Sequence, residues 1–334
     1  MTRLSVLDLS AVGLGGDPAR AMRDTIETAR AADRLGYHRF WVSEHHSIAG
    51  LASASPEVLI AALTQATQRI RLGSGGVMLV NYSPLKVAEV FMALEALAPG
   101  RIDLGIGRAL GADPRTAGAL RSAGSEAFAQ YFALLNAWLL DASGKEPIPP
   151  GHPLHGISAS PSGPGCPDLF LLCSSPETAA FAGRVGVGMV FAEFIARSDA
   201  DAAIAAYRQA FSPSPFRQTP WAGAALFAFA AADATEAWRL DAPRRAAALA
   251  TAQGAPRRFG DIDQALAFLE EHAGDPGLAA ILARSVVGAP GEVRAQLERR
   301  MRASEADELF ILATGPDLQS RIRCLELLAP GSDA

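Results

Sequence analysis

Short apolar runs recur along this chain, and stretches with helical periodicity fill the intervals between them. The runs are continuously apolar rather than alternating, which is typical of strands that are buried on both faces of a parallel sheet. We predict eight strands, at residues 4–9, 38–43, 70–79, 101–107, 169–174, 188–193, 223–229 and 308–314.

The stretches between these runs predict helices. The first has the clearest boundaries, because Asp17 can cap it, Pro18 suits its first turn and Gly36 ends it. In the stretches that follow, apolar residues recur at helical spacing. These helices are predicted at residues 56–69, 83–97, 125–140, 176–186, 198–211, 233–250, 261–273, 291–303 and 317–328.

Strands that alternate with helices in this way form parallel βαβ units. Eight such units favour an α/β fold with one closed (β/α)8 TIM barrel, which spans residues 1–334 as a single domain. A doubly wound open sheet is the second choice. It is disfavoured because no G-x-G-x-x-G sequence follows the first strand, as a dinucleotide-binding half requires.

Two segments interrupt the alternation of predicted strands and helices. They predict loop insertions near residues 146–167 and 241–260. The first contains seven prolines and four glycines, so it cannot be a helix. The second is rich in alanine and arginine. We expect both segments to be mobile and to cover the active end of the barrel. The arginines expected to be solvated are Arg244, Arg245, Arg257 and Arg258.

Composition narrows the classes of function. The net charge is −5, so no bulk attraction to nucleic acid or acidic membranes is expected. The three cysteines form no CxxC pair, which fits a reducing compartment. Asp8 interrupts the first apolar run, so we expect no signal peptide, and no run approaches the ~20 residues of a membrane helix. The sequence therefore predicts a soluble, cytoplasmic protein.

The candidate chemistry lies where the predicted strands end. In a barrel of this kind, reactive groups sit on the loops after the C-terminal ends of the strands. Glu44, His45 and His46 directly follow the second strand. A zinc site is disfavoured, because consecutive strand residues point to opposite faces and the HExxH spacing is absent. Two interpretations stay open: packing or surface histidines, or a polar pocket in which one imidazole donates to a ligand.

The third and fourth predicted strands also end in candidate residues. The sequence GSGG at residues 73–76 weakens a strand interior, so Gly75 and Gly76 indicate either a close ligand or simple packing. Asn81 follows, where its amide could reach the same end of the barrel. Arg108 follows the fourth strand, and because an unpaired buried cation is costly, it should face either a carboxylate or an anionic ligand.

Hydroxyl residues stand where the fifth predicted strand turns into a helix, in the sequence SSPET. Ser175 is a good N-cap. The free backbone N–H groups of this helix start, together with Ser174, Ser175 and Thr178, could bind a phosphate, provided that Glu177 points away. Ordinary capping without any ligand is the alternative.

Taken together, these stretches resemble the bacterial-luciferase-like flavin-dependent monooxygenases, and most closely their one-chain oxidoreductase subgroup. The resemblance runs in one order over nearly the whole chain and is densest over residues 1–120. It implies a TIM barrel that binds FMN at its C-terminal mouth. Reduced FMN, supplied by a separate flavin reductase, and O2 would oxygenate a small molecule through a flavin C4a-(hydro)peroxide. The resemblance is carried by LSVLDLS, GYHRFWVSEHH, SGGVMLVNYSPLKVAEVF, LEALAPGRIDLGIGRALGADPRT and SSPETAAFAGRVG.

The resemblance also implies roles for single residues. His45 would lie beside the flavin ring and the substrate, with Glu44 as a second catalytic candidate and His46 less important for both catalysis and folding. No metal ligand is implied, and the family favours a homodimer. The cofactor-binding candidates are Gly75, Gly76, Asn81, Arg108, Ser174, Ser175 and Thr178.

The chain departs from the family pattern at several of these places, which predicts an altered pocket and weak FMN binding. Alternatives within the fold are a flavin- or deazaflavin-dependent reductase and a non-catalytic flavin-binding relative. The departures are Val80 and Tyr82 in VNYSPL, where relatives read PNHSPL, Leu110 in GRALG, where relatives read GRAPG, Cys173 in place of glycine, Glu177 beside the proposed phosphate, and Glu193 and Phe194 where histidines are common.

Overall fold

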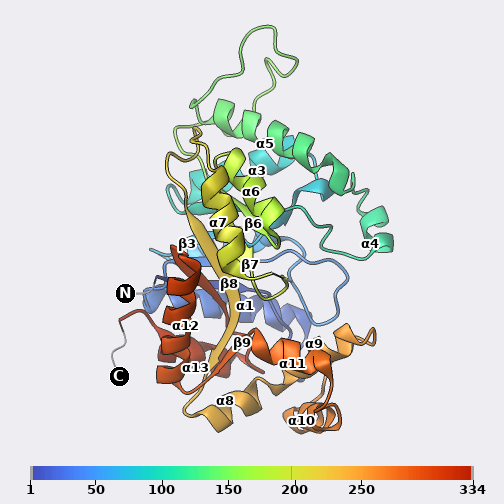
Figure 1. Ribbon diagram of the computed structural model, residues 1–334. Helices are drawn as coiled ribbons and strands as arrows, with labels where there is room; N and C mark the ends of the chain where they lie inside the picture. The colour runs from blue at the N-terminus through green and yellow to red at the C-terminus, as the bar shows by residue number, and fades with distance from the viewer. Residues whose placement is uncertain (1–2, 197, 332–334) are drawn as a thin grey trace.

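A closed barrel of eight parallel strands, surrounded by helices, forms the centre of the molecule (Figure 1). The computed structural model describes residues 3–196 and 198–331. Because β10 pairs with both β1 and β8, the sheet closes on itself, which confirms the predicted (β/α)8 TIM barrel and excludes an open sheet. The barrel strands are β1 (Leu4–Asp8), β2 (Arg39–Val42), β3 (Arg71–Ser74), β5 (Ile102–Gly107), β6 (Asp168–Cys173), β7 (Gly188–Ala192), β8 (Ala222–Ala230) and β10 (Glu308–Leu312).

Helices between these strands cover the outside of the barrel. Asp17 caps the first of them by accepting the Arg20 N–H at 2.8 Å, and Gly36 follows its end with a φ of +81° that favours glycine. Within the described residues, no helix is both long and apolar enough to cross a membrane. The covering helices are α1 (Pro18–Arg34), α2 (Pro56–Ala66), α3 (Pro84–Leu97), α5 (Phe128–Ala142), α6 (Pro176–Arg184), α7 (Ala200–Ala210), α12 (Pro290–Ser304) and α13 (Leu318–Leu328).

The single strand predicted over residues 70–79 is wrong. After β3 the chain turns through a cis peptide bond between Gly75 and Gly76, and then forms β4 (Val77–Met78) and the short 3-10 helix η1 (Leu79–Asn81). A Cβ atom on Gly75 would lie 2.5 Å from Leu7 Cδ1, and one on Gly76 would lie 2.7 Å from the Gly105 carbonyl oxygen. Packing against backbone therefore requires glycine at Gly76, whereas at Gly75 a Cβ atom would displace the end of the Leu7 side chain.

The prediction of a loop insertion over 241–260 is also wrong, because much of this segment is helical. It belongs to a helical insertion between β8 and β10 that has a small core of its own, formed by residues such as Leu249, Phe259 and Phe268. The helix predicted over 233–250 breaks at Asp241. The insertion contains α8 (Ala234–Leu240), α9 (Ala242–Ala252), α10 (Ile262–Glu271), α11 (Pro276–Ala283) and β9 (Ser285–Gly288); the last two, like α4 (Pro114–Ala119) and the 3-10 helix η2 (Ser125–Ala127), were not predicted as separate elements.

Asp241 explains why the expected solvation of two arginines is wrong. Its carboxylate is buried and lies 2.6 Å from Arg244 Nε and 3.3 Å from Arg245 Nε, so both guanidinium groups are drawn inward. Arg257 and Arg258 are exposed, as predicted. Arg258 Nη2 donates to the Gly13 carbonyl oxygen at 3.0 Å, which ties the insertion to the loop after β1.

The irregular segment 146–167 lies at the opposite end of the barrel from the loop after β1. It joins α5 to the N-terminal end of β6, whereas the helical insertion begins at the C-terminal end of β8. Figure 1 shows the segment at the top of the molecule and α9, α10 and α11 at the bottom right. The expectation that residues 146–167 cover the active end is therefore wrong, because a helix-to-strand connection returns to the N-terminal face.

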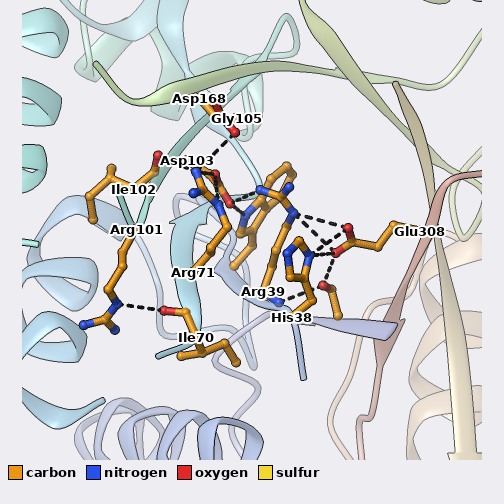
Figure 2. Close-up of polar contacts among 12 residues, drawn as sticks. His38, Arg39, Ile70, Arg71, Arg101, Ile102, Asp103, Gly105, Asp168 and Glu308 are labelled. Atoms are coloured by element: carbon orange, nitrogen blue, oxygen red, sulfur yellow. Dashed lines mark hydrogen bonds and ion pairs between the residues drawn. The ribbon is translucent and has the colours of Figure 1, made fainter. Parts of the chain in front are cut away.

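A buried charge network closes this N-terminal face of the barrel. Asp103, which is fully buried, lies 2.7 Å from Arg39 Nη1 and also pairs with Arg71. Arg39 Nε in turn lies 3.3 Å from Glu308, whose carboxylate also contacts His38 at 3.0 Å. Figure 2 shows these side chains converging on the carboxylates of Asp103 and Glu308. We call these five residues the closed-end network.

Candidate active site

The loop after β2 places a buried carboxylate at the C-terminal end of the barrel. Glu44 has 0% of its surface exposed. Its Oε1 atom lies 2.7 Å from His46 Nε2 and accepts from the Tyr82 hydroxyl at 2.9 Å, while Oε2 accepts the Met78 N–H at 3.1 Å. Glu44 therefore connects its own loop to the segment that follows β3.

Burial changes the acid–base behaviour of this group. It raises the pKa of Glu44, and the hydrogen bonds from His46, Met78 and Tyr82 oppose the rise. Burial also raises the pKa of Tyr82, and the charge on Glu44 raises it further. The tyrosine therefore stays a neutral hydroxyl that donates to the carboxylate.

His45 has different partners, although it lies between Glu44 and His46 in the sequence. Its Nδ1 lies 3.1 Å from Ser43 Oγ, and its backbone N–H donates to the Ser53 carbonyl oxygen at 2.9 Å. Burial lowers the pKa of His45, and a charge on His46 lowers it further. His45 is therefore a neutral imidazole at pH 7.

These contacts argue against a zinc site at Glu44, His45 and His46. The Glu44 and His46 side chains bond to each other, whereas the His45 ring bonds to Ser43. Across the described residues, no group of three or more His, Cys, Asp or Glu side chains is arranged to hold a metal ion. Both histidines are half-buried and hydrogen-bonded, so the two interpretations that the sequence left open, packing histidines and a polar pocket wall, stay predictions.

Hydrogen bonds join three loops at this end of the barrel. The His46 N–H donates to the Gly111 carbonyl oxygen at 2.9 Å, and Asn81 Nδ2 donates to the Leu110 carbonyl oxygen at 3.0 Å. Asn81 Oδ1 is buried and has no hydrogen-bond partner among the described residues. The loops after β2, β4 and β5 therefore form one continuous wall, in which the Asn81 donor group is already engaged.

A cavity of about 270 Å³ opens beside this wall, between β5, β6, α5 and α6. Arg108 and Arg184 bring positive charge to it, Glu126 and Glu177 bring negative charge, and Thr178 adds a hydroxyl. The other lining residues are mainly apolar. Arg108 is exposed and forms no ion pair within the part of the chain that the structure describes. The sequence analysis allowed either a carboxylate or an anionic ligand as the partner of Arg108, and a carboxylate partner is not observed.

The start of α6 borders the same cavity. Ser175 is its N-cap, as predicted, and its Oγ accepts the Thr178 N–H at 3.4 Å. Ser174 and Glu177 are exposed, and a hydrogen bond with Ser175 lowers the pKa of Glu177. Capping accounts for Ser175 by itself, so only Thr178 among the three predicted hydroxyl residues lines the cavity.

The residues that depart from the family pattern have local partners. Cys173 lines the cavity as a buried thiol, and burial raises its pKa to about 12, so it is neutral. Glu193 forms an ion pair with Arg300 of α12. Phe194 packs edge-on against Phe227, with ring centroids 5.6 Å apart.

Three contributors to this end of the barrel were missed in the sequence. Arg184 could have been found, because Thr178, Phe181 and Arg184 recur at three-residue spacing and so share one face of α6. Glu126 gives no such indication, since it reaches the cavity from a different connection. The hydrogen bond of Tyr82 to Glu44 depends on the fold, because the two residues lie in different loops.

Comparisons with known proteins agree with this fold. The sequence model of the luciferase-like monooxygenase family matches residues 2–308. A luciferase-like monooxygenase of Escherichia coli K12 is 36% identical over 330 residues, which cover 97% of this chain and 95% of that protein. The crystal structure of apo-MsnO8 superposes with a TM-score of 0.89 and 38% identity, covering 98% of both chains. The oxygenating constituent of 3,6-diketocamphane monooxygenase from Pseudomonas putida, solved with FMN, shares the fold with a TM-score of 0.70, 20% identity and coverage of 99% and 98%.

Proposed function

This chain belongs to the luciferase-like monooxygenase family, and on that premise we propose that it uses reduced FMN and O2 to oxygenate a small organic molecule. Bound reduced FMN would supply the electrons that activate O2. The protein would bind and orient the cofactor at the C-terminal end of the barrel and exclude water from it.

One observation carries this proposal. Arg108 reaches a cavity at the start of α6 without an ion-pair partner among the described residues. A helix start offers free N–H groups and a partial positive charge, which favour a phosphate. A cavity of about 270 Å³ suits the phosphate end of FMN. Gly75, Gly76 and His45, which do not line this cavity, are the candidates for contact with the flavin ring on the basis of the resemblance alone.

His45 is the proposed catalytic residue. As a neutral imidazole, it could donate a proton to, or hold one at, the reacting oxygen. We assign Glu44 a supporting position rather than direct contact, because its two oxygens already receive protein donors. Asn81, Ser174 and Ser175 remain cofactor-binding candidates, with weaker support than Arg108 and Thr178.

The proposal also includes a partner enzyme, an oligomeric state and a cellular location. A separate flavin reductase would deliver reduced FMN, the chain would act as a homodimer, and its place would be the cytoplasm. The reductase and the homodimer follow from the resemblance, and the cytoplasmic location follows from the composition of the sequence. They are tested by dependence on an added reductase, by light scattering and by cell fractionation.

The test compares cofactors and follows the reaction. Purified protein is melted with FMN, reduced FMN and a deazaflavin, and 18O incorporation from O2 is then measured across a panel of small molecules. At a hundredfold excess over Kd, FMN should stabilise the fold by about 2.7 kcal/mol. Stabilisation by the deazaflavin alone would point to the reductase alternative, and an FMN complex with no turnover to the non-catalytic one.

A further inference from the structure

Glu44, His46 and Tyr82 form a compact cluster in which two side chains converge on one carboxylate oxygen. His46 Nε2 and the Tyr82 hydroxyl lie 2.7 and 2.9 Å from the same Glu44 oxygen, and they lie 3.4 Å from each other. Glu44 and His46 follow β2, whereas Tyr82 follows η1. This cluster of three side chains therefore joins two loops, and neither loop can form it alone.

The donors around Glu44 fix where the protons lie. The Met78 N–H can only donate, and it occupies Oε2. The Tyr82 hydroxyl is neutral and donates to Oε1. Since the carboxylate accepts from both, the remaining contact at 2.7 Å requires the proton on His46 Nε2. In the neutral form of the ring, Nδ1 of His46 would then carry the lone pair.

We propose that Tyr82 is a positioning residue for the two histidines at the mouth. Its hydroxyl holds Glu44 in the orientation that fixes His46 as the Nε2–H tautomer. His45 lies in the same loop, which the His46 N–H anchors to the Gly111 carbonyl oxygen. The effect of Tyr82 on turnover rests on the proposed function, whereas its effect on the His46 tautomer does not.

His45 supplies an internal reference for this idea. Its ring bonds to Ser43 Oγ and not to Glu44, so its tautomer does not depend on the Tyr82 hydroxyl. Tyr131 supplies a matched control, because it is a half-buried tyrosine on α5 whose hydroxyl makes no hydrogen bond within the described residues.

The test is the 15N NMR spectrum of the histidine rings in the cofactor-free protein, at about pH 9, where free imidazole is neutral. Wild type, Tyr82→Phe and Tyr131→Phe are compared, with His45→Gln and His46→Gln for assignment. In wild type, Nε2 of His46 should carry the proton. In Tyr82→Phe, the His46 nitrogens should shift toward a mixture of tautomers while those of His45 stay in place. Tyr131→Phe should match wild type.

Unchanged His46 signals in Tyr82→Phe would overturn the proposal, as would equal shifts of His45 and His46. If Tyr82→Phe does not fold, Glu44→Gln keeps the shape of the carboxylate and must show the same His46 shift.

A second test measures activity. At metal sites, removal of a carboxylate partner that orients a histidine typically lowers activity 10–100-fold. By analogy we expect Tyr82→Phe to lower kcat about tenfold, with a displaced pH profile and a nearly unchanged KM. A tautomer shift without that loss would leave Tyr82 a structural residue and overturn its role in turnover. A tautomer shift in a protein that proves not to use flavin would reject only the proposed function.

Discussion

Asp103 and Arg108, at the two ends of this barrel, differ in burial and in how many charged partners they have. At the N-terminal end, the buried carboxylate of Asp103 accepts hydrogen bonds from Arg39, Arg71 and Trp41 Nε1. At the C-terminal end, Arg108 is exposed beside a cavity and has no ion-pair partner among the described residues. Figure 2 shows Arg39 and Arg71 beside Asp103, and Arg39 and His38 beside Glu308.

The difference separates residues that hold the barrel together from residues that can hold a ligand. A buried charge with several partners is costly to disturb but has no bonding capacity left for anything else. An arginine without such partners can still bind an anion. In TIM barrels the N-terminal face serves stability and the C-terminal face serves chemistry. Asp103 and Arg108 follow that division, whereas Glu44 is an exception, because it is buried with three protein partners at the C-terminal end.

The largest expected effect is on stability, at the closed end. Asp103→Asn leaves Arg39 and Arg71 without their shared carboxylate, and removing one partner of a buried ion pair typically costs about 3–5 kcal/mol. We expect the free energy of unfolding, measured by urea denaturation, to fall by that amount. The FMN affinity of the folded fraction should not change.

The control for this variant is an exposed ion pair. Arg30 lies beside Glu27 on α1, with about half of each side chain exposed, so Arg30→Gln should cost less than about 1 kcal/mol. Equal losses of unfolding free energy in the two variants would show that the closed-end network stabilises the fold no more than an exposed ion pair does.

The next largest effect is expected on catalysis, at the C-terminal end of the barrel. His45→Gln should keep its fold and lose product formation at least 100-fold, since positioned proton transfer contributes about 10²–10⁴. His46→Gln should lose less activity. The sequence-based expectation that His46 also matters less for folding now changes, because its removal takes a donor from the buried Glu44 carboxylate, at a typical cost of about 1–3 kcal/mol. Melting temperature and 18O product analysis separate the two effects. A larger catalytic loss in His46→Gln would reverse the assignment.

A smaller effect concerns binding alone. Arg108→Gln should weaken FMN roughly tenfold, in line with charge-assisted hydrogen bonds to a phosphate, and should leave the melting temperature of the free protein unchanged. Arg115→Gln is the control, because Arg115 is also exposed and does not line the cavity. Fluorescence quenching of FMN measures both affinities, and a loss of affinity in both variants would indicate only general electrostatics.

The smallest effect is expected at Glu177. Its negative charge borders the cavity, so Glu177→Gln should tighten FMN binding a few-fold, and the gain should shrink at high salt because the group is exposed. Glu271→Gln, on the exposed end of α10, should have no effect. Weaker FMN binding in Glu177→Gln would mean that this carboxylate points away from the phosphate and supports the loop instead.

Local patterns predicted the barrel but not the insertion. The apolar runs identified all eight barrel strands, and Asp17, Ser55, Ser83 and Ser175, each followed by proline, stand just before helices α1, α2, α3 and α6. Residues 234–283 were harder, because their helices pack largely on one another through small side chains such as those of Ala242 and Ala246. Pro243 could have indicated the break after α8, which was not predicted, since proline is favoured in the first turn of a helix.

The site was predictable as far as neighbours in sequence define it. The rule that barrel chemistry follows strand ends placed Glu44, His45, Arg108 and Thr178 at one end of the barrel. Contacts between loops were not predictable, because they depend on the closed fold. Tyr82 was noticed only as a departure from a family pattern, and its hydrogen bond to Glu44 spans 38 positions.

The most direct test of the account is a comparison of FMN with riboflavin, which has the same ring system but no phosphate. Binding to the purified protein is followed by flavin fluorescence and by the melting temperature. We predict that FMN binds at least ten times more tightly than riboflavin in wild type, and that Arg108→Gln removes most of this difference. Equal affinity for the two flavins, or no melting shift with millimolar FMN in either oxidation state, would contradict the claim that the open end of the barrel holds a flavin phosphate.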